Sequence, residues 1–144
     1  MVVQSACVFC DIIAGTGPAE ILYRDAHSVS FLDIMPSAPG HALVVPVNHH
    51  TDLFSLSAEE LAAIACHSQF LARHIMAACG AKGMGVHQLN GALAGQTVFH
   101  YHNHLIPAYP GVRRGLHGRQ RASAAALAET AAAIRQQILD PQSN

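Results

Sequence analysis

The sequence predicts an α+β fold built on an antiparallel sheet, and three observations support this prediction. Segments with the alternation of strands follow one another along the chain, two long stretches show helical spacing of apolar residues, and the β-α-β order of a parallel sheet is not seen. The chain has 144 residues, of which 51% are hydrophobic and 12% charged. This size and composition exclude intrinsic disorder and predict one domain over residues 1–144, with its core in residues 1–110 and a C-terminal helix near residues 121–140.

The first half of the chain is expected to hold a short helix and three strands. The stretch CVFCDIIAG reads as a helix ended by Gly15, and Gly17-Pro18 breaks the chain after it. Two prolines and a glycine exclude regular structure from residues 35–40. Strands are predicted over residues 21–24, 28–34 and 41–45.

The second half is expected to hold two long helices and two strands. Ser57 and Glu60 form a capping box, and Gly80 ends the helix that it opens. Pro107 is expected to stop the last strand. The predicted elements are a helix over residues 58–79, strands over 84–89 and 98–106, and a helix over 124–139. The expected inner face of the first helix is made by Leu61, Ile64, Ala65, Leu71, Ala72, Ile75 and Met76.

Charge and hydropathy exclude several classes of protein. Lys and Arg number 8 against 9 Asp and Glu, so no basic field is present to hold a nucleic-acid polymer. No apolar run reaches the roughly 18–20 residues of a membrane span, and the first residues do not resemble a signal peptide. We therefore expect a cytoplasmic protein that binds neither membranes nor nucleic-acid polymers.

The chemistry-bearing pattern is a row of alternating histidines. Side chains two residues apart on a strand point the same way at about 6.6 Å, so His100, His102 and His104 are expected to line one face. One metal ion cannot be reached by all three along such an extended line. A division of labour fits better, with one nucleophilic imidazole and flanking groups that orient and stabilise. A backbone carbonyl at Nδ1 of the nucleophile would leave its Nε2 free to attack phosphorus.

The loop directly before this row suits an anion. Gly91, Gly95, Gln96 and Thr97 can offer amides and a hydroxyl to a phosphate, although a plain hairpin connection explains the glycines equally well.

The four cysteines divide into two kinds. Cys66 and Cys79 lie within a helical pattern and are expected to be small buried side chains. Cys7 and Cys10 form a CxxC with no strand before it, which fits poorly with a thioredoxin-like redox motif. Two thiolates need two further ligands for a closed zinc site, and the alternative is a pair of reduced thiols in a frayed N-terminus.

Three segments resemble the histidine triad (HIT) family, and in particular its bacterial, Hint-like branch. These segments are CVFCDIIAG at residues 7–15, FLDIMPSAPGHALVVP at residues 31–46 and GQTVFHYHNHLIP at residues 95–107. The resemblance implies a HIT-like fold, with a five-stranded antiparallel sheet and two main packing helices. It also implies a homodimer that acts on small purine nucleotides.

The resemblance assigns roles to individual residues. His102 would attack the α-phosphorus and form a covalent nucleotidyl intermediate, and His104 would donate to the phosphate oxygens. Asp33 would accept from the ribose hydroxyls, although a turn cap before Pro36 is its simplest reading from the residues alone. The substrate-binding residues implied are Phe31, Asp33, Ile34, Asn90, Gln96 and Thr97.

The resemblance also implies a structural zinc ion. Its ligands would be Cys7, Cys10, His49 and His100, with His50 as a substitute for His49. Such a site has no open position, so the metal would fix the N-terminal segment and the direction of the His102 ring. His41 is expected to make a structural polar contact. No role is expected for His27, His67, His74, His87 and His117.

Five residues depart from the family pattern. Leu89 replaces a phosphate-contacting Asn or Gln, a role that Asn90 or Gln88 would take over. Ala108 replaces an arginine that Arg113 or Arg114 would supply, Val47-Asn48 replaces a charged pair, and Asn103 stands where an apolar residue is usual.

The function expected is hydrolysis or transfer at the α-phosphorus of purine nucleoside phosphoramidates or dinucleoside polyphosphates. The alternatives are a zinc-stabilised nucleotide-binding or protein-interaction module with little turnover, and a protein that handles metal only.

Overall fold

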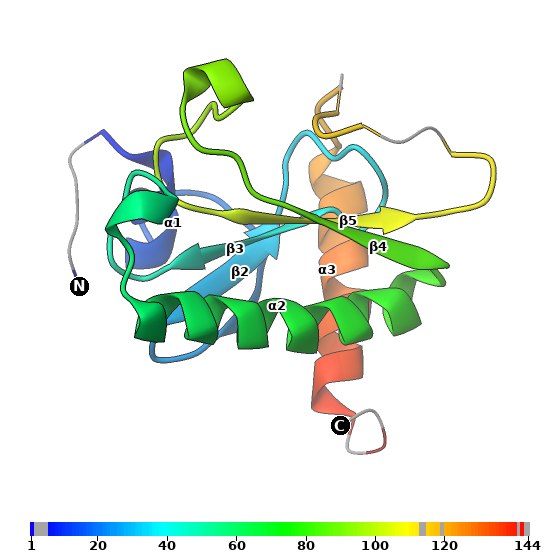
Figure 1. Cartoon of the computed structure of the whole chain (residues 1–144). Coiled ribbons are helices and arrows are strands. Elements are labelled where there is room, and N and C mark those ends of the chain that lie inside the picture. Colours follow the sequence, from blue (N-terminus) through cyan, green and yellow to red (C-terminus); the bar gives the residue numbers. More distant parts are fainter. Residues whose placement is uncertain (2–5, 113–114, 119, 141, 143–144) are drawn as a thin grey trace.

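A five-stranded antiparallel sheet forms the centre of the computed structural model, with the strand order β1-β2-β3-β5-β4 (Figure 1). The structure describes residues 1, 6–112, 115–118, 120–140 and 142. The strands are β1 (Ile21–Arg24), β2 (Ser28–Leu32), β3 (Ala42–Pro46), β4 (Gly83–His87) and β5 (Asn103–Ala108). The α+β fold with a five-stranded antiparallel sheet is therefore confirmed.

In the described part of the chain, three α-helices and two short 3-10 helices surround the sheet. They are α1 (Val8–Ala14), η1 (Leu53–Ser55), α2 (Ala58–Cys79), η2 (Ala92–Ala94) and α3 (Ala124–Leu139). The capping box predicted at the start of α2 is present, because Ser57 Oγ accepts from the Glu60 amide and the Glu60 carboxylate accepts from the Ser57 amide. Within the described residues, no helix is long and apolar enough to cross a membrane.

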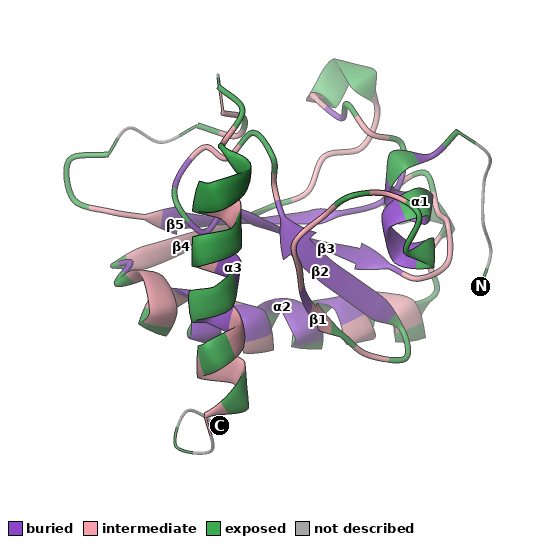
Figure 2. Cartoon of the chain, turned by 180° about the vertical axis from the view of Figure 1, so that it is seen from behind, coloured by how far each residue is buried: buried purple, intermediate pink, exposed green. Residues whose placement is uncertain are grey.

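The sheet carries apolar residues on both faces. One core layer joins α2 and α3 to the sheet through Ile64, Leu71, Val44, Leu105 and Ile134. A second layer joins the N-terminal helix to the opposite face through Phe9, Ile13, Val29, Leu43 and Val45. Every residue of β2 and β3 is consequently buried, as the purple strands in Figure 2 show. The second layer anchors the short α1 directly beside the candidate site.

Several predicted boundaries are wrong. The last strand begins at Asn103 rather than residue 98, so His100 and His102 lie in the chain that leads into β5. It also continues through Pro107 to Ala108. The pairing of β5 with β3 ends at Leu105, so the missing amide of Pro107 removes no ladder hydrogen bond on that side.

Smaller differences are found elsewhere. The second strand ends at Leu32 and β4 spans Gly83–His87, which shortens one predicted strand and shifts the other. Cys66 is exposed and Cys79 half-buried, so neither is the buried side chain expected. Ala65 is exposed as well, because the inner face of α2 uses His67 and Ser68 instead.

His67 is a buried polar contact between α2 and the sheet. Its Nδ1 lies 2.8 Å from Ser28 Oγ, and its Nε2 lies 2.8 Å from Ser30 Oγ. Asp25 Oδ2 is 3.4 Å from Nδ1. Both ring nitrogens therefore have partners, which satisfies the rule for a buried imidazole and explains a histidine to which no function was assigned.

The chain between β5 and α3 is tied to the loop that follows β2. Ser37 Oγ donates to the Gly115 carbonyl at 2.7 Å, the Gly118 amide donates to Met35 at 3.1 Å, and the Ala122 amide donates to Ile34 at 2.9 Å. In Figure 1 this yellow-to-orange segment passes beside the cyan loop. We call residues 115–118 and 120–122 the C-terminal strap.

Candidate active site and metal centre

Two cysteines and two histidines meet at the N-terminus of α1. Cys7 caps the helix, and its sulfur accepts from the Cys10 amide at 3.4 Å. The sulfur of Cys7 lies 3.5 Å from His100 Nδ1, and that of Cys10 lies 3.6 Å from the same atom. His49 Nδ1 is 3.4 Å from the Cys10 sulfur and 3.2 Å from His100 Nδ1. The CxxC turn thus gathers two thiols around two imidazole nitrogens.

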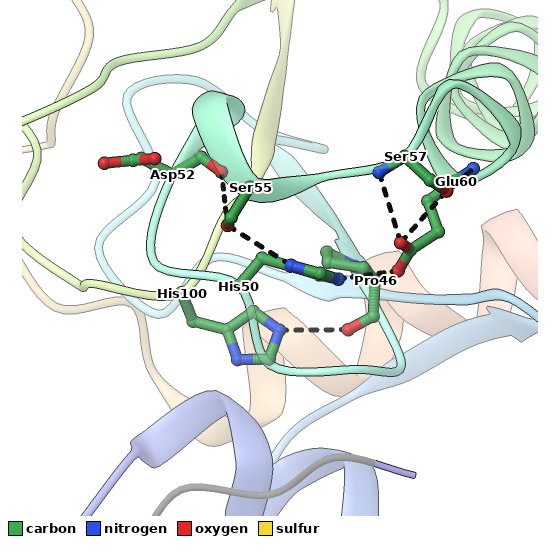
Figure 3. Close-up of polar contacts among 7 residues, drawn as sticks. All are labelled: Pro46, His50, Asp52, Ser55, Ser57, Glu60 and His100. Carbon is green, nitrogen blue, oxygen red and sulfur yellow. Dashed lines mark hydrogen bonds and ion pairs between the residues drawn. The ribbon is translucent and has the colours of Figure 1, made fainter.

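Hydrogen bonding leaves a ligand lone pair on His100. Its Nε2 donates to the Pro46 carbonyl at 2.9 Å (Figure 3), so its Nδ1 carries no proton. That Nδ1 is the atom that lies next to both cysteine sulfurs. The same view shows that both ring nitrogens of His50 have other partners. Its Nε2 lies 2.7 Å from Glu60 Oε2, and its Nδ1 lies 3.2 Å from Ser55 Oγ. The geometry therefore brings His49 to the cluster and commits His50 to the start of α2.

The donor set fits a tetrahedral zinc ion. Zinc at about 2.3 Å from sulfur and about 2.0–2.1 Å from nitrogen places sulfur and nitrogen ligands about 3.5 Å apart and two nitrogens about 3.3 Å apart. The separations of 3.4–3.6 Å and 3.2 Å agree with these values. The bare Nδ1 of His100 supplies one nitrogen ligand directly. Cys7, Cys10, His49 and His100 are thus able to hold zinc.

His102 presents a bare nitrogen to the site. Its Nδ1 donates to the His100 carbonyl at 2.7 Å, which is the contact expected for a nucleophilic imidazole and leaves the lone pair on Nε2. Phe9 meets the His102 ring edge-on at a centroid distance of 5.1 Å, and His104 meets it at 4.8 Å. The side chain is 7% exposed, so packing on two sides fixes its direction.

A chain of hydrogen bonds sets the tautomer of His104. The Ser37 amide donates to His41 Nδ1 at 3.0 Å, so the His41 proton is on Nε2. That Nε2 lies 3.0 Å from His104 Nδ1, which accepts, and the His104 proton is consequently on its own Nε2. This Nε2 is buried and has no hydrogen-bond partner among the described residues. The polar contact expected of His41 is confirmed, and its consequence is an unpaired donor beside His102.

Burial keeps these imidazoles neutral. Desolvation lowers the pKa of His41 to about 4 and that of His104 to about 3, and neighbouring histidines add to both shifts. Burial also lowers the pKa of His102, partly offset by its hydrogen bond to His100 and by the charge of Asp33. The lone pair on His102 Nε2 is therefore available at neutral pH.

The predicted nucleoside-binding residues lie at the end of β2. Asp33 Oδ1 accepts from the Met35 amide at 2.9 Å, so the turn cap considered from the sequence is present, while Oδ2 lies 3.5 Å from His41 Nε2. Burial raises the pKa of Asp33. Ile34 is 41% exposed, whereas Phe31 is 2% exposed and packs against Phe9. Ile34 therefore offers an apolar surface, whereas Phe31 belongs to the core and is not open to a ligand.

The glycine-rich loop before the histidines is held by its own side chains. Gln96 Oε1 accepts from the Gly91 amide, and its Nε2 donates to the carbonyls of Thr51 and Val98. The Gln96 side chain was expected to contact phosphate. In the structure its amide is instead bonded to three backbone groups and holds the loop in shape. Thr97 is exposed and available to a ligand.

Asn90 and Asn103 are also committed to the protein. Asn90 Oδ1 accepts from the Leu53 amide at 2.8 Å, and its Nδ2 donates to Gln88. Asn103 is buried, donates to Ser68 Oγ and accepts from the Tyr101 hydroxyl, which explains a polar residue where an apolar one is usual. Arg113 and Arg114, the expected replacements for a missing arginine, lie outside the described residues.

Two residues at the site were missed by the sequence reasoning. Phe9 lies between the two cysteines, and its ring contacts both His100 and His102. His117, to which no role was given, comes from the C-terminal strap and meets the His104 ring at 5.7 Å. Only the position of Phe9 inside the CxxC could have signalled the first, and nothing in the local pattern signals the second.

The site is thus a set of buried neutral imidazoles above an antiparallel sheet, beside a Cys–His cluster. The HIT domain family model matches residues 14–111 of the chain. The adenosine 5'-monophosphoramidase hnt1 of Schizosaccharomyces pombe is 40% identical over 102 residues, which cover 71% of this chain and 74% of that protein. The chain belongs to the HIT domain family.

Solved structures agree with this assignment. A Hit-like protein involved in cell-cycle regulation from Bartonella henselae superposes with a TM-score of 0.84 at 32% identity, covering 94% of this chain and 98% of that one. A zinc-bound histidine triad family protein from Mycobacterium smegmatis gives a TM-score of 0.79 at 33% identity, covering 91% and 94%.

Proposed function

We propose that this protein is a nucleotide hydrolase or nucleotidyl transferase that acts at an α-phosphorus through a covalent adduct on His102. The observation that carries the proposal is the pairing of a bare His102 Nε2 with the unpaired Nε2 proton of His104. The first is a nucleophile at neutral pH, and the second is a donor for the phosphate oxygens on which negative charge grows. Relatives in the family include a nucleoside monophosphoramidase, which supports the same chemistry.

The substrates proposed are purine nucleoside phosphoramidates or dinucleoside polyphosphates. Asp33 Oδ2 would accept from the ribose hydroxyls, while its other oxygen holds the turn. Ile34, which is exposed, would lie against the base, and the buried Phe31 would shape the strand that precedes it. Thr97 would contact phosphate from the loop that Gln96 and Asn90 hold in shape.

Zinc, in this proposal, has a structural role only. Cys7, Cys10, His49 and His100 would hold it with no open coordination position. The ion supplies a rigid cross-link when bound. The chain's own residues then position the nucleophile, since the His100 carbonyl orients His102 and Phe9 packs against its ring.

A cytoplasmic homodimer completes the proposal. The edge strand β4 is paired on one side only, and Val86 within it is 57% exposed. Exposed edges favour pairing with another chain, which supports a sheet that continues into a second copy. Light scattering at several protein concentrations measures the mass directly.

The test is capture of the adduct. Protein incubated with an AMP-amidate labelled at the α-phosphorus and quenched in alkali should carry label on His102, mapped by mass spectrometry. His102→Ala should lose label and turnover by several orders of magnitude, while His27→Ala, an exposed histidine at the β1–β2 turn, should keep both. Tight binding of AMP with no labelled protein in the wild type would instead favour a binding module.

A further inference from the structure

His117 lies beside His104, on the segment that joins β5 to α3. The sequence indicated no role for His117. Its ring is nearly perpendicular to that of His104 at 85° and 5.7 Å. Its charge is felt by Asp33, His41, His102 and His104, which are the titratable groups that face it. The strap that carries it is fixed on both sides, by the Gly115 carbonyl and by the Gly118 amide. His117 is therefore placed in the site by built contacts.

The other imidazoles of the site have both nitrogens assigned. His41 uses Nδ1 for the Ser37 amide and Nε2 for His104. The Nδ1 proton of His102 donates to the His100 carbonyl and its Nε2 is the proposed nucleophile, while His104 Nε2 is the proposed donor to the phosphate oxygens. None of these buried groups readily takes up a proton from solvent, since burial lowers the pKa of each.

His117 differs from these three histidines in its exposure and in its hydrogen bonding. Its side chain is exposed, and no hydrogen bond joins its nitrogens to another described residue. The rings of His102 and His117 both meet that of His104, so a phosphoryl group bound at His104 lies within reach of both. An exposed imidazole exchanges protons with water, as a general acid that acts repeatedly must.

We propose that His117 is the general acid and base of the reaction, donating a proton to the amine that leaves the α-phosphorus and later accepting one from water. This inference rests on the proposed function. In the first step the His102 Nε2 lone pair bonds to phosphorus, the P–N bond breaks, and its electron pair stays on the amine nitrogen, which takes the proton from the His117 imidazolium. In the second step water attacks phosphorus and gives a proton to neutral His117. The P–Nε2 bond then breaks, its electron pair returns to His102, and AMP is released.

The experiment compares two leaving groups on the same nucleotide. An AMP-alkylamide needs a proton on its departing nitrogen, whereas the p-nitrophenyl ester of AMP releases a stable anion that needs none. His117→Ala and His117→Gln should lose about 10²-fold or more in kcat/KM on the alkylamide and less than about 3-fold on the ester. Free imidazole added to His117→Ala should restore part of the alkylamide rate, because the position is open to solvent. His27→Ala is the matched control.

The outcomes separate this inference from the function beneath it. Equal losses on both substrates would assign His117 to substrate contact or to packing and overturn the acid role, as would no loss on either. Wild-type protein that forms no nucleotidyl-histidine with either substrate would overturn the proposed function itself. Melting temperatures measured for each variant show whether the strap has stayed folded.

Discussion

His41 is a residue through which the tautomer of the site can be changed without touching substrate. Its Nδ1 accepts from the Ser37 amide and its Nε2 donates to His104 Nδ1, each at 3.0 Å. A glutamine places an amide N–H2 near the position of Nε2, whereas an asparagine reaches only that of Nδ1. His41→Gln therefore keeps the donor to His104, and His41→Asn keeps only a partner for Ser37.

The two variants should differ in activity far more than in stability. Each leaves one polar group without its partner, which costs about 1–3 kcal/mol. In His41→Asn, however, the His104 proton is no longer held on Nε2, so the donor toward the phosphate is lost for part of the population. Loss of one such donor reduces kcat by about 10²–10³-fold. We expect a reduction of about 10²-fold for asparagine and less than about 10-fold for glutamine.

Three measurements check this reasoning. Turnover of an AMP-amidate gives kcat, urea unfolding gives the free energy of unfolding, and ¹⁵N chemical shifts report which nitrogen of His104 carries the proton. Equal activity of the two variants, or a wild-type His104 protonated on Nδ1, would falsify the relay.

Three further predictions follow from other contacts. Gly40→Ala should destabilise the protein more than Gly80→Ala. Both glycines have positive φ, but a Cβ on Gly40 would lie 2.9 Å from Cys79 Sγ, whereas a Cβ on Gly80 would meet open space. The difference in the free energy of unfolding, measured in urea, should be about 1–3 kcal/mol, and equal losses would contradict the prediction. Protein purified with zinc should contain one ion per chain, and chelation should expose two more thiols, those of Cys7 and Cys10, to a thiol reagent and lower the melting temperature; unchanged thiol counts would remove the metal site. The free energy of unfolding should fall as pH drops from about 6.5 toward about 4, because folding lowers the pKa of His41 to about 4 and the unfolded chain then binds more protons. His41 alone contributes a slope of up to about 1.4 kcal/mol per pH unit, which His41→Gln should remove in parallel urea titrations.

Local signals predicted the parts of the fold that depend on local physics. The capping box of Ser57 and Glu60 fixed the start of α2, and the last helix spans the predicted residues because its apolar spacing and its cap act within a few turns. The strand leading to His104 was predicted too long. The Tyr101 amide donates to the His50 carbonyl instead of to β3, and that partner cannot be read from alternation in the row itself.

The site shows the same division. The alternating spacing and the family resemblance together indicated His102 and His104, and the resemblance indicated the Cys–His cluster, whose four donor atoms the fold gathers. The resemblance did not predict which side chains are already hydrogen-bonded within the protein. Gln96 has the right type for a phosphate contact but spends its amide on three backbone groups. His117 lies in an unpatterned segment, and only the hydrogen bonds of the strap bring it to His104.

The two sides of the site, the Cys7–Cys10 turn and the C-terminal strap with His117, lie outside the central part of the domain. The HIT domain family model matches residues 14–111, and Cys7, Cys10 and His117 lie outside the matched residues. A variant changed only in these flanking residues would keep the nucleophile intact, while losing the proposed metal cross-link at one end or the solvent-facing imidazole at the other. Differences in leaving-group preference should therefore be compared with the sequences of both terminal segments as well as with that of the histidine row.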